Sequence, residues 1–181
     1  ALQEFEQMVT RARAADMTVR GGIQCAFGYQ TPGDVAPDEV LPIARHFLEE
    51  LGVDELALAD SSGLANPRQV QALLTAVVPL ANGRPIILHL HDTRGMGQAN
   101  VLAALHSGVT HFDTAFGGLG GCPFIDDATG NIATEDTVYM LHEMGIHTGV
   151  DLHRLAALSR RYAGLLHHDT LPGKLYRLLE P

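Results

Sequence analysis

The stretch PIILHLHD, residues 85–92, has the apolar start of a buried strand and ends in two histidines and an aspartate. Because successive side chains of a strand point to opposite faces, His89 and His91 project from one side, and Leu88 and Leu90 from the other. Valine or isoleucine would pack better than imidazole in a core strand. The two histidines are therefore candidates for a function.

Segments with strand and helix patterns alternate on both sides of residues 85–92. We expect further strands at residues 19–27, 55–60 and 109–115, and helices at residues 2–17, 37–51, 66–81, 97–106, 132–144 and 151–165. Strands followed by helices at a spacing of about 30 residues predict βαβ units and a parallel sheet. No GxGxxG motif follows the first strand, which disfavours a dinucleotide site. The pattern predicts a small open sheet or part of a (β/α)8 barrel, which takes about 250 residues when complete.

The composition is that of an ordinary globular protein. The chain has 181 residues, of which 46% are hydrophobic and 18% are charged, and a chain of this size can bury a real core. We expect residues 1–181 to form a single α/β domain. The two cysteines, Cys25 and Cys122, suit a reducing compartment better than a disulfide scaffold. Since the opening also lacks the pattern of a signal peptide, we expect a cytoplasmic location.

Charge and hydropathy disfavour several classes of function. A formal net charge of −9, without a basic cluster, argues against nucleic acid as a partner. No apolar run reaches about 18 residues, so we expect no membrane span. Lys174 is the single lysine in the sequence, which leaves almost no candidate for an aldolase that works through a lysine Schiff base.

Polar and sulfur side chains lie near the carboxyl ends of all the predicted strands. Reactive groups of parallel sheets gather at this edge. Cys25 lies near the end of the first strand and Asp60 ends the second. His89 and His91 end the third strand, and Asp113 lies in the fourth. We therefore expect one edge of the sheet to contain the site.

Several of these side chains have both a structural and a functional interpretation. A lone core histidine is more often hydrogen-bonded to backbone carbonyls than a ligand, but His89 and His91 on one face can share an ion. Asn131, at the start of the fifth predicted helix, could equally cap that helix or face a cation. Asp60 could equally cap the turn into Ser61. An imidazole pair with an amide oxygen and carboxylates favours six-coordinate Mg²⁺ or Mn²⁺ over tetrahedral Zn²⁺.

The glycine-rich loop GGLGGCPFIDDATGN, residues 117–131, contains the second cysteine. It could be a surface turn around a buried thiol. However, its clustered glycines permit close backbone approach to a ligand, and loops of this length inside compact domains are usually functional. Cys122 could act as an acid or a base once its pKa is tuned.

Three motifs together resemble the 3-hydroxy-3-methylglutaryl-CoA lyases: HLHDTRG at residues 89–95, GGLGGCPF at residues 117–124 and TGNIATEDTVYML at residues 129–141. This family belongs to a group of metal-dependent lyases and Claisen synthases built on TIM barrels. The resemblance covers nearly all of the chain. The GLGGCP sequence distinguishes the chain from isopropylmalate and citramalate synthases, which share the HxH element.

The resemblance implies a function and roles for five residues. His89 and His91, of the HxH motif, and Asn131, of the GN motif, would be ligands of a divalent metal, Mg²⁺ or Mn²⁺. Cys122, His89 and Asp60 would be the catalytic residues, with Cys122 in the catalytic loop and Asp60 beside the substrate. The implied reaction is retro-Claisen cleavage of an acyl-CoA, 3-hydroxy-3-methylglutaryl-CoA, to acetyl-CoA and acetoacetate, as in leucine degradation and ketone body formation.

The chain departs from the family at its beginning. The first strand of the family barrel has an Arg-Asp pair in a motif resembling GPRDGLQNE, which does not occur here. The chain thus corresponds to the C-terminal half of the barrel, four βα units without the first strands. We expect it to form a homo-oligomer or to bind a complementing N-terminal half. The alternatives are a lyase for another 3-hydroxyacyl-CoA and an inactive half-barrel that serves only in assembly.

Overall fold

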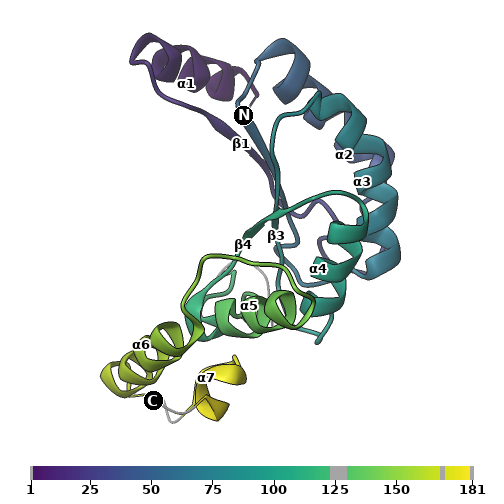
Figure 1. The fold of residues 1–181 in the computed structure, drawn as a ribbon. Helices are drawn as coiled ribbons and strands as arrows, with labels where there is room; N and C mark the ends of the chain where they lie inside the picture. The colour runs from purple at the N-terminus through teal and green to yellow at the C-terminus, as the bar shows by residue number, and fades with distance from the viewer. Residues whose placement is uncertain (1, 123–129, 168–169, 180–181) are drawn as a thin grey trace.

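A computed structural model of the protein describes residues 2–122, 130–167 and 170–179 (Figure 1). None of the helices in these ranges is both long and apolar enough to cross a membrane. In chain order the elements are α1 (Leu2–Ala14), β1 (Arg20–Ile23), α2 (Pro37–Arg45), the π-helical segment η1 (His46–Glu50), β2 (Glu55–Ala59), α3 (Pro67–Ala81), β3 (Ile86–His89), α4 (Gly97–His106), β4 (His111–Asp113), the 3-10 turn η2 (Phe116–Gly118), α5 (Thr134–Glu143), α6 (Leu152–Leu165) and α7 (Leu175–Leu178).

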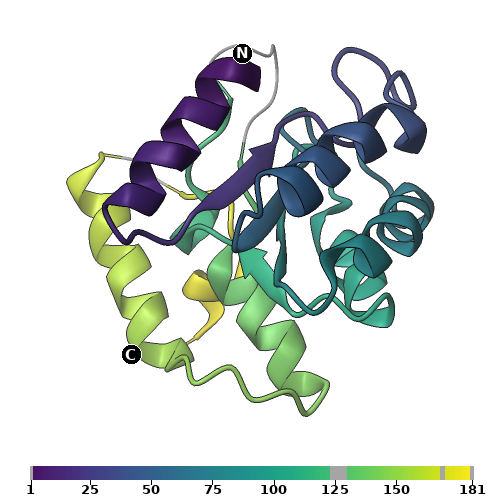
Figure 2. The same ribbon diagram turned by 90° about the horizontal axis from the view of Figure 1, so that it is seen from above.

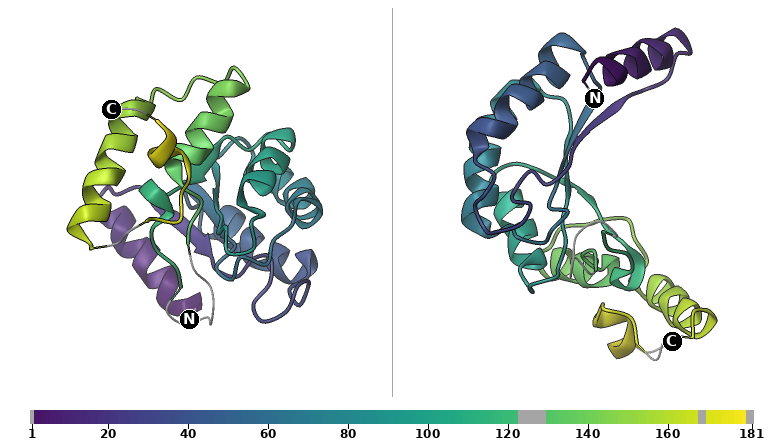
Figure 3. Two further views of the ribbon diagram at one scale, coloured as in Figure 1. Left: turned by 90° about the horizontal axis from the view of Figure 1, so that it is seen from below. Right: turned by 180° about the vertical axis from the view of Figure 1, so that it is seen from behind.

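Within the described residues, four strands form one parallel sheet in the order β1-β2-β3-β4. Parallel neighbours need a crossover that returns the chain to the starting edge, and the helices between the strands provide it. Seen from above, α2, α3, α4 and α5 follow one another around the strands (Figure 2), and the view from below shows the same order (Figure 3). This arrangement confirms the predicted α/β fold.

The sheet is curved. Arg20, at the start of β1, donates a hydrogen bond from Nη1 to Oδ1 of Asp113, at the end of β4, over 3.1 Å. Neighbouring strands lie about 4.8 Å apart, so β1 and β4 would be about 14 Å apart in a flat sheet. A contact between the two outer strands therefore requires the sheet to bend, as the wall of a barrel does.

The main hydrophobic core lies between the sheet and the helices that follow its strands. Leu56, Leu58 and Leu88, from β2 and β3, are fully buried. α3 adds an apolar stripe at helical spacing, which comprises Val70, Leu73, Leu74, Val77 and Ala81. Burying each large aliphatic side chain contributes about 1.5–3 kcal/mol, so this layer supplies much of the stability that positions the strand ends.

Both ends of α3 are those that the sequence predicts. Asn66 is the N-cap, and its Oδ1 accepts a hydrogen bond from the backbone N–H of Gln69 (3.1 Å). Gln69 Oε1 accepts one from the backbone N–H of Asn66 (3.1 Å), which completes a capping box. The helix ends at Asn82, whose φ of 48° is left-handed, and Gly83 follows.

Several elements are shorter than predicted. β1 ends at Ile23 rather than at residue 27, because the chain turns at Cys25, which has a left-handed φ of 53°. β4 covers three residues rather than 109–115. The helix expected at 37–51 changes to π-helical hydrogen bonding at His46, and α5 starts at Thr134 rather than at residue 132. These ends depend on hydrogen-bond partners elsewhere in the fold, which local patterns do not show.

Candidate active and metal site

The segment that contains Asn131 lies beside the carboxyl end of β3. The backbone N–H of Ile132 donates a hydrogen bond to the carbonyl oxygen of Leu90 (3.1 Å), and His91 and Asn131 form an isolated antiparallel bridge. The chain after the glycine-rich loop thus pairs with the residues that follow β3. This pairing brings Asn131 next to His91 at the predicted edge of the sheet.

His89 and His91 lie close together at this edge. Their ring centroids are 5.4 Å apart and their planes are inclined by 58°. The His91 residue is 4% exposed, and its Nδ1 has no hydrogen-bond partner among the described residues. Burial, and to a lesser degree the charge of His89, lowers the pKa of His91 to about 4, so this ring is neutral near pH 7. A neutral imidazole with a free nitrogen is the form of histidine that binds metals.

His89 is more open than His91. Its Nδ1 lies 3.7 Å from Oδ2 of Asp113, and its side chain is 35% exposed. A carboxylate near one nitrogen of an imidazole orients the ring, so that the other nitrogen is available to a metal. Arg20 bonds to the same carboxylate. The contact between the two outer strands of the curved sheet therefore also keeps Asp113 beside His89.

The side chain of Asn131 is oriented by the glycine-rich loop. Its Nδ2 donates a hydrogen bond to the carbonyl oxygen of Leu119 (2.9 Å), which leaves Oδ1 buried and without a partner among the described residues. The alternative that Asn131 caps the fifth helix is wrong, since the N-cap of α5 is Ala133 and no side chain caps it. The helix begins after a short extended segment, which moves Asn131 out of the capping position.

The donor atoms at this edge fit a divalent metal ion. Buried polar atoms without hydrogen-bond partners are rare in folded proteins, and two of them, His91 Nδ1 and Asn131 Oδ1, belong to bridge partners here. A cation would satisfy both atoms. In the described part of the chain, no group of three or more histidine, cysteine, aspartate or glutamate side chains could hold a metal ion by itself. The chain thus offers part of a mixed nitrogen and oxygen ligand set.

Asp60, directly after β2, has one engaged and one free carboxylate oxygen. Oδ1 accepts hydrogen bonds from the backbone N–H groups of Leu64 (2.9 Å) and Ala65 (3.1 Å), whereas Oδ2 is buried and has no partner among the described residues. Burial raises the pKa of Asp60 to about 6, against the opposing effects of these hydrogen bonds and of Arg94. The capping role is therefore present, and it leaves the second oxygen available for chemistry.

Cys25 and Cys122 are both free thiols and both half-buried. The backbone N–H of Cys25 donates a hydrogen bond to Oγ of Ser61 (3.2 Å), the residue after Asp60. Burial raises the pKa of Cys25; the hydrogen bond with Ser61 opposes this, and negative charge on Cys122 and Asp60 adds to it. Cys25 is thus a further side chain at the site, although the sequence assigns a role only to Cys122.

The loop that contains Cys122 is held by a buried carboxylate. Glu135, in the first turn of α5, accepts hydrogen bonds on its two oxygens from the backbone N–H of Gly117, at 3.1 and 2.8 Å. Its Oε1 also accepts one from the hydroxyl of Ser159 on α6. Acidic residues are common in first helical turns, so the sequence does not reveal this contact. The part of the loop at residues 123–129 lies outside the described residues.

A curved parallel sheet with helices around it, and with polar side chains at the carboxyl ends of its strands, defines part of a TIM-barrel enzyme. The HMGL-like family model matches residues 1–161. The chain belongs to the HMGL-like family.

Named relatives agree with this assignment. The mitochondrial hydroxymethylglutaryl-CoA lyase of Rattus norvegicus is 43% identical over 155 residues, which are 86% of this chain and 47% of that protein. The mitochondrial hydroxymethylglutaryl-CoA lyase of Homo sapiens is 41% identical over 158 residues, which are 86% of this chain and 47% of that protein. The chain thus spans about half the length of the curated relatives it matches.

Solved structures agree as well. An HMG-CoA lyase from Acinetobacter baumannii, in complex with coenzyme A and 3-methylmalate, has a TM-score of 0.90 at 41% identity, over 98% of this chain and 59% of that chain. Hydroxymethylglutaryl-CoA lyase from Pseudomonas aeruginosa has a TM-score of 0.88 at 36% identity, over 98% of this chain and 58% of that chain. These likenesses confirm the resemblance noted in the sequence and the partial TIM-barrel fold.

Proposed function

We propose that this chain is the metal-binding half of a 3-hydroxy-3-methylglutaryl-CoA lyase. Membership of the HMGL-like family and the names of the relatives support this activity. The observation that supports it most strongly is a pair of buried donor atoms, His91 Nδ1 and Asn131 Oδ1, which belong to bridge partners at the carboxyl edge of the sheet and have no hydrogen-bond partner in the described part of the chain. A metal-dependent enzyme needs such a pair, whereas a purely structural half-barrel gains nothing from it.

We assign His89, His91 and Asn131 as ligands of one divalent cation, Mg²⁺ or Mn²⁺. Two imidazole nitrogens and an amide oxygen leave about three positions of a six-coordinate ion for other oxygen ligands, including those of the substrate. When bound, the ion polarises the hydroxyl and carbonyl oxygens of the substrate. Because the pKa of His91 is lowered to about 4, this ligand has no proton to lose near pH 7.

The proposed reaction breaks the bond between C2 and C3 of 3-hydroxy-3-methylglutaryl-CoA. A base removes the proton of the C3 hydroxyl, and C3 becomes the ketone carbon of acetoacetate. The electron pair of the broken bond passes to the thioester and gives the enolate of acetyl-CoA. Protonation of this enolate at C2 completes acetyl-CoA.

Asp60 and Cys122 supply the two proton transfers. The Asp60 Oδ2 atom accepts no hydrogen bond from residues 2–122, 130–167 or 170–179, and a pKa of about 6 suits a general base near neutral pH. We assign to it the removal of the hydroxyl proton. Cys122 then donates its thiol proton to C2.

The rest of the barrel is also part of the proposal. The relatives are about twice as long as the matched segment, so an N-terminal half-barrel, or a second copy of this chain, would complete the site and cover the sheet edges.

A cytoplasmic location stays a proposal, because one rat relative is named cytoplasmic and another mitochondrial. A different 3-hydroxyacyl-CoA is the second candidate substrate, favoured by the 3-methylmalate in the Acinetobacter baumannii structure.

The test is release of acetoacetate from 3-hydroxy-3-methylglutaryl-CoA with added Mn²⁺, by the 181-residue chain alone and mixed with an N-terminal half-barrel from a relative. His91→Ala should abolish turnover. The matched control is His106→Ala, which removes an exposed histidine of α4 and should leave turnover unchanged. Equal turnover in the two variants would overturn the ligand assignment.

The substrate is tested in the same assay by competition. If a second 3-hydroxyacyl-CoA is cleaved faster than 3-hydroxy-3-methylglutaryl-CoA, the acyl group of the proposal is wrong and the reaction class stands. If Mn²⁺ binds but no acyl-CoA is cleaved in either mixture, the chain is an inactive assembly partner.

A further inference from the structure

Asp60 begins a turn, residues 60–65, whose backbone places its carboxylate. The backbone N–H groups of Leu64 and Ala65 donate hydrogen bonds to Oδ1 of Asp60. The N–H of Gly63 donates to the carbonyl oxygen of the same residue (3.1 Å). Because the side chain is bonded to the backbone of its own turn, any group that fixes this backbone also fixes the carboxylate.

Asn100, on α4, binds the last residue of this turn. Its Nδ2 donates a hydrogen bond to the carbonyl oxygen of Ala65 (3.0 Å). Asn100 is fully buried, and its Oδ1 has no hydrogen-bond partner among the described residues. A buried polar atom without a partner lowers stability, which offsets the gain from the bond that Nδ2 makes. The distinctive contribution of Asn100 is therefore the position of the turn and not the stability of the helix.

Arg94, between β3 and α4, binds the middle of the same turn. Its Nη1 donates hydrogen bonds to the carbonyl oxygens of Ser62 (2.9 Å) and Gly63 (3.1 Å). Gly63 also lies against the residues after β3, since a Cβ there would be 2.6 Å from Oγ1 of Thr93 and 3.4 Å from Cβ of His91. The turn thus fits closely against residues 91–94.

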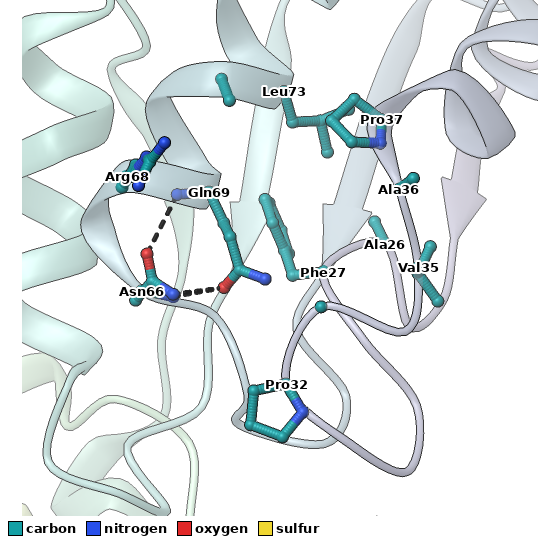
Figure 4. Close-up of a pocket in the computed structure, with 12 residues that line it drawn as sticks. Ala26, Phe27, Pro32, Val35, Ala36, Pro37, Asn66, Arg68, Gln69 and Leu73 are labelled. Atoms are coloured by element: carbon teal, nitrogen blue, oxygen red, sulfur yellow. Dashed lines mark hydrogen bonds between the residues drawn. The ribbon is translucent and has the colours of Figure 1, made fainter.

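The turn is also fixed to the loop after β1 and to α3. The hydroxyl of Ser62 donates to the carbonyl oxygen of Gly28 (2.7 Å). Asn66, which follows the turn, is the N-cap of α3 and exchanges hydrogen bonds with Gln69 (Figure 4). These contacts hold the turn against the rest of the sheet, whereas those of Arg94 and Asn100 join it to the segment that begins with His91.

A proposed base and a proposed metal ligand are therefore linked through one short segment. Arg94 lies three residues after His91, and Asn100 lies in the first half of α4 (Gly97–His106). A carboxylate removes a proton from the substrate only within hydrogen-bond reach of it. A displacement of about 1 Å can lower the rate about 100-fold, so the link has a use in catalysis.

We propose that Asn100 and Arg94 are positioning residues, which hold the Asp60 carboxylate at a fixed place relative to the metal ligand His91. Asn100 fixes the end of the turn that supplies the Ala65 N–H, and Arg94 fixes its middle. Neither side chain needs to touch the substrate. The proposal rests on the proposed role of Asp60 as the base, and it goes further by naming the residues that place this base.

The first test needs no lyase activity. Hydrogen exchange of the metal-free 181-residue chain, followed by NMR, reports the amides of Leu64 and Ala65, which bond to Asp60. We expect Asn100→Leu to speed the exchange of both amides at least about tenfold, because local opening of the turn becomes easier. Circular dichroism verifies that each variant is folded. If Asn100→Leu does not fold, Arg94→Met, at an exposed position, replaces it in this test.

The matched control for Asn100→Leu is Gln98→Leu. Gln98 is a second amide on α4, and its Oε1 is also buried without a hydrogen-bond partner in the described ranges. However, its Nε2 donates to Oγ1 of Thr137 on α5 (3.0 Å) and not to the turn. Gln98→Leu should therefore leave the exchange of the turn amides unchanged.

The second test is acetoacetate release from 3-hydroxy-3-methylglutaryl-CoA with Mn²⁺, in the mixture with an N-terminal half-barrel. We expect Asn100→Leu and Arg94→Met to lower kcat about tenfold or more, with KM and Mn²⁺ affinity unchanged, because substrate and metal still bind while the base is displaced. Arg94→Lys keeps a donor for the turn carbonyls and should restore most of the lost kcat.

The matched control for Arg94→Met is Arg84→Met. Arg84 also donates hydrogen bonds to backbone carbonyls, those of Leu48 and Val53, but it lies before the amino end of β3. Arg84→Met removes the same kind of contact at the edge opposite the candidate site. Whatever it costs in stability, kcat should be retained.

The proposal is overturned if the turn amides exchange alike in Asn100→Leu and Gln98→Leu, or if they exchange faster while kcat is retained. Loss of Mn²⁺ affinity together with kcat would also overturn it, because Asn100 and Arg94 would then support the metal ligands and not the base. If the unmodified mixture shows no turnover, the proposed lyase activity fails, and hydrogen exchange alone decides whether the two residues position Asp60.

Discussion

The carboxylate of Glu135 accepts hydrogen bonds from the backbone N–H of Gly117, at 2.8 and 3.1 Å. Glu135 is fully buried, and the hydroxyl of Ser159 binds the same side chain from α6. Three segments are thereby joined: α5, α6 and the start of the loop that contains Cys122. A buried carboxylate is tolerated because these donors replace its hydration.

Removing this carboxylate should destabilise the chain. Glu135→Ala leaves the Gly117 N–H and the Ser159 hydroxyl buried without partners, which costs about 3 kcal/mol in the free energy of unfolding. Glu135→Gln keeps one acceptor and should cost about 1 kcal/mol. Urea denaturation measures both, with Glu143→Gln, an exposed change on α5, as the control. A loss for Glu135→Ala no larger than that for Glu143→Gln would show that the contact contributes nothing.

Metal binding should depend on Asn131 as well as on the histidines. We expect His91→Ala to weaken Mn²⁺ binding more than about 100-fold, because even residues that only orient ligands cost 10–100-fold. Asn131→Ala should weaken it strongly, whereas Asn131→Asp keeps an oxygen ligand and should bind at least as well as the unmodified chain. Electron paramagnetic resonance of free Mn²⁺ gives the affinities, and His106→Ala serves as the control. Retained affinity in Asn131→Ala would remove Asn131 from the ligand set.

Gly120, in the glycine-rich loop, should affect metal affinity through the position of the Asn131 side chain. A Cβ at Gly120 would lie 2.6 Å from Nδ2 of Asn131, so Gly120→Ala must displace the amide that faces the cation. We expect Mn²⁺ affinity to fall about tenfold. Gly145→Ala is the matched control, since Gly145 also has a left-handed φ and a Cβ there meets nothing within 4 Å. The idea fails if both variants lose the same affinity, because backbone strain alone then explains the effect.

The stability of the metal-free chain should show the titration of Asp60. Its pKa is raised from 3.8 to about 6 in the folded state, so the folded chain binds more protons than the unfolded chain between these values. The free energy of unfolding therefore falls as pH rises from about 4 to about 6, by about 3 kcal/mol for this group. Asp60→Asn removes the titration and serves as the reference at each pH. A constant difference between the two proteins from pH 4 to pH 7 would contradict the raised pKa.

His91 should give the opposite pH dependence. Its pKa is lowered from 6.5 to about 4, so the unfolded chain binds the extra proton in this range. Stability due to the neutral buried ring is present above about pH 6.5 and is lost as pH falls to about 4, by about 3 kcal/mol. Denaturation of the metal-free chain and of His91→Gln at several pH values isolates this contribution. A difference that grows as pH rises from 4 to 6.5 supports it, and one that shrinks over that range refutes it.

The order of the four strands and of helices α1 to α6 could be predicted because it depends on local patterns, whereas the short helix α7 was not predicted. Apolar periodicity and glycine stops place each element to within a few residues, as for α3 between Asn66 and Asn82. The concentration of Asp60, His89 and His91 at one edge also follows from the sequence, since strands that alternate with helices must run parallel. The ends of β1 and β4 could not be predicted in the same way, because they depend on pairing with other strands.

The sequence alone therefore determined the α/β class, the family resemblance and the edge of the sheet where the reactive side chains lie, all of which follow from neighbours along the chain. Only the tertiary structure decided that Asn131 Oδ1 and one oxygen of Asp60 are buried without a hydrogen-bond partner among the residues that the structure describes. It also decided that Glu135 holds the loop and that Arg20 meets Asp113 across a curved sheet. These properties depend on burial and on hydrogen-bond partners distant in sequence, and folding alone brings such groups together.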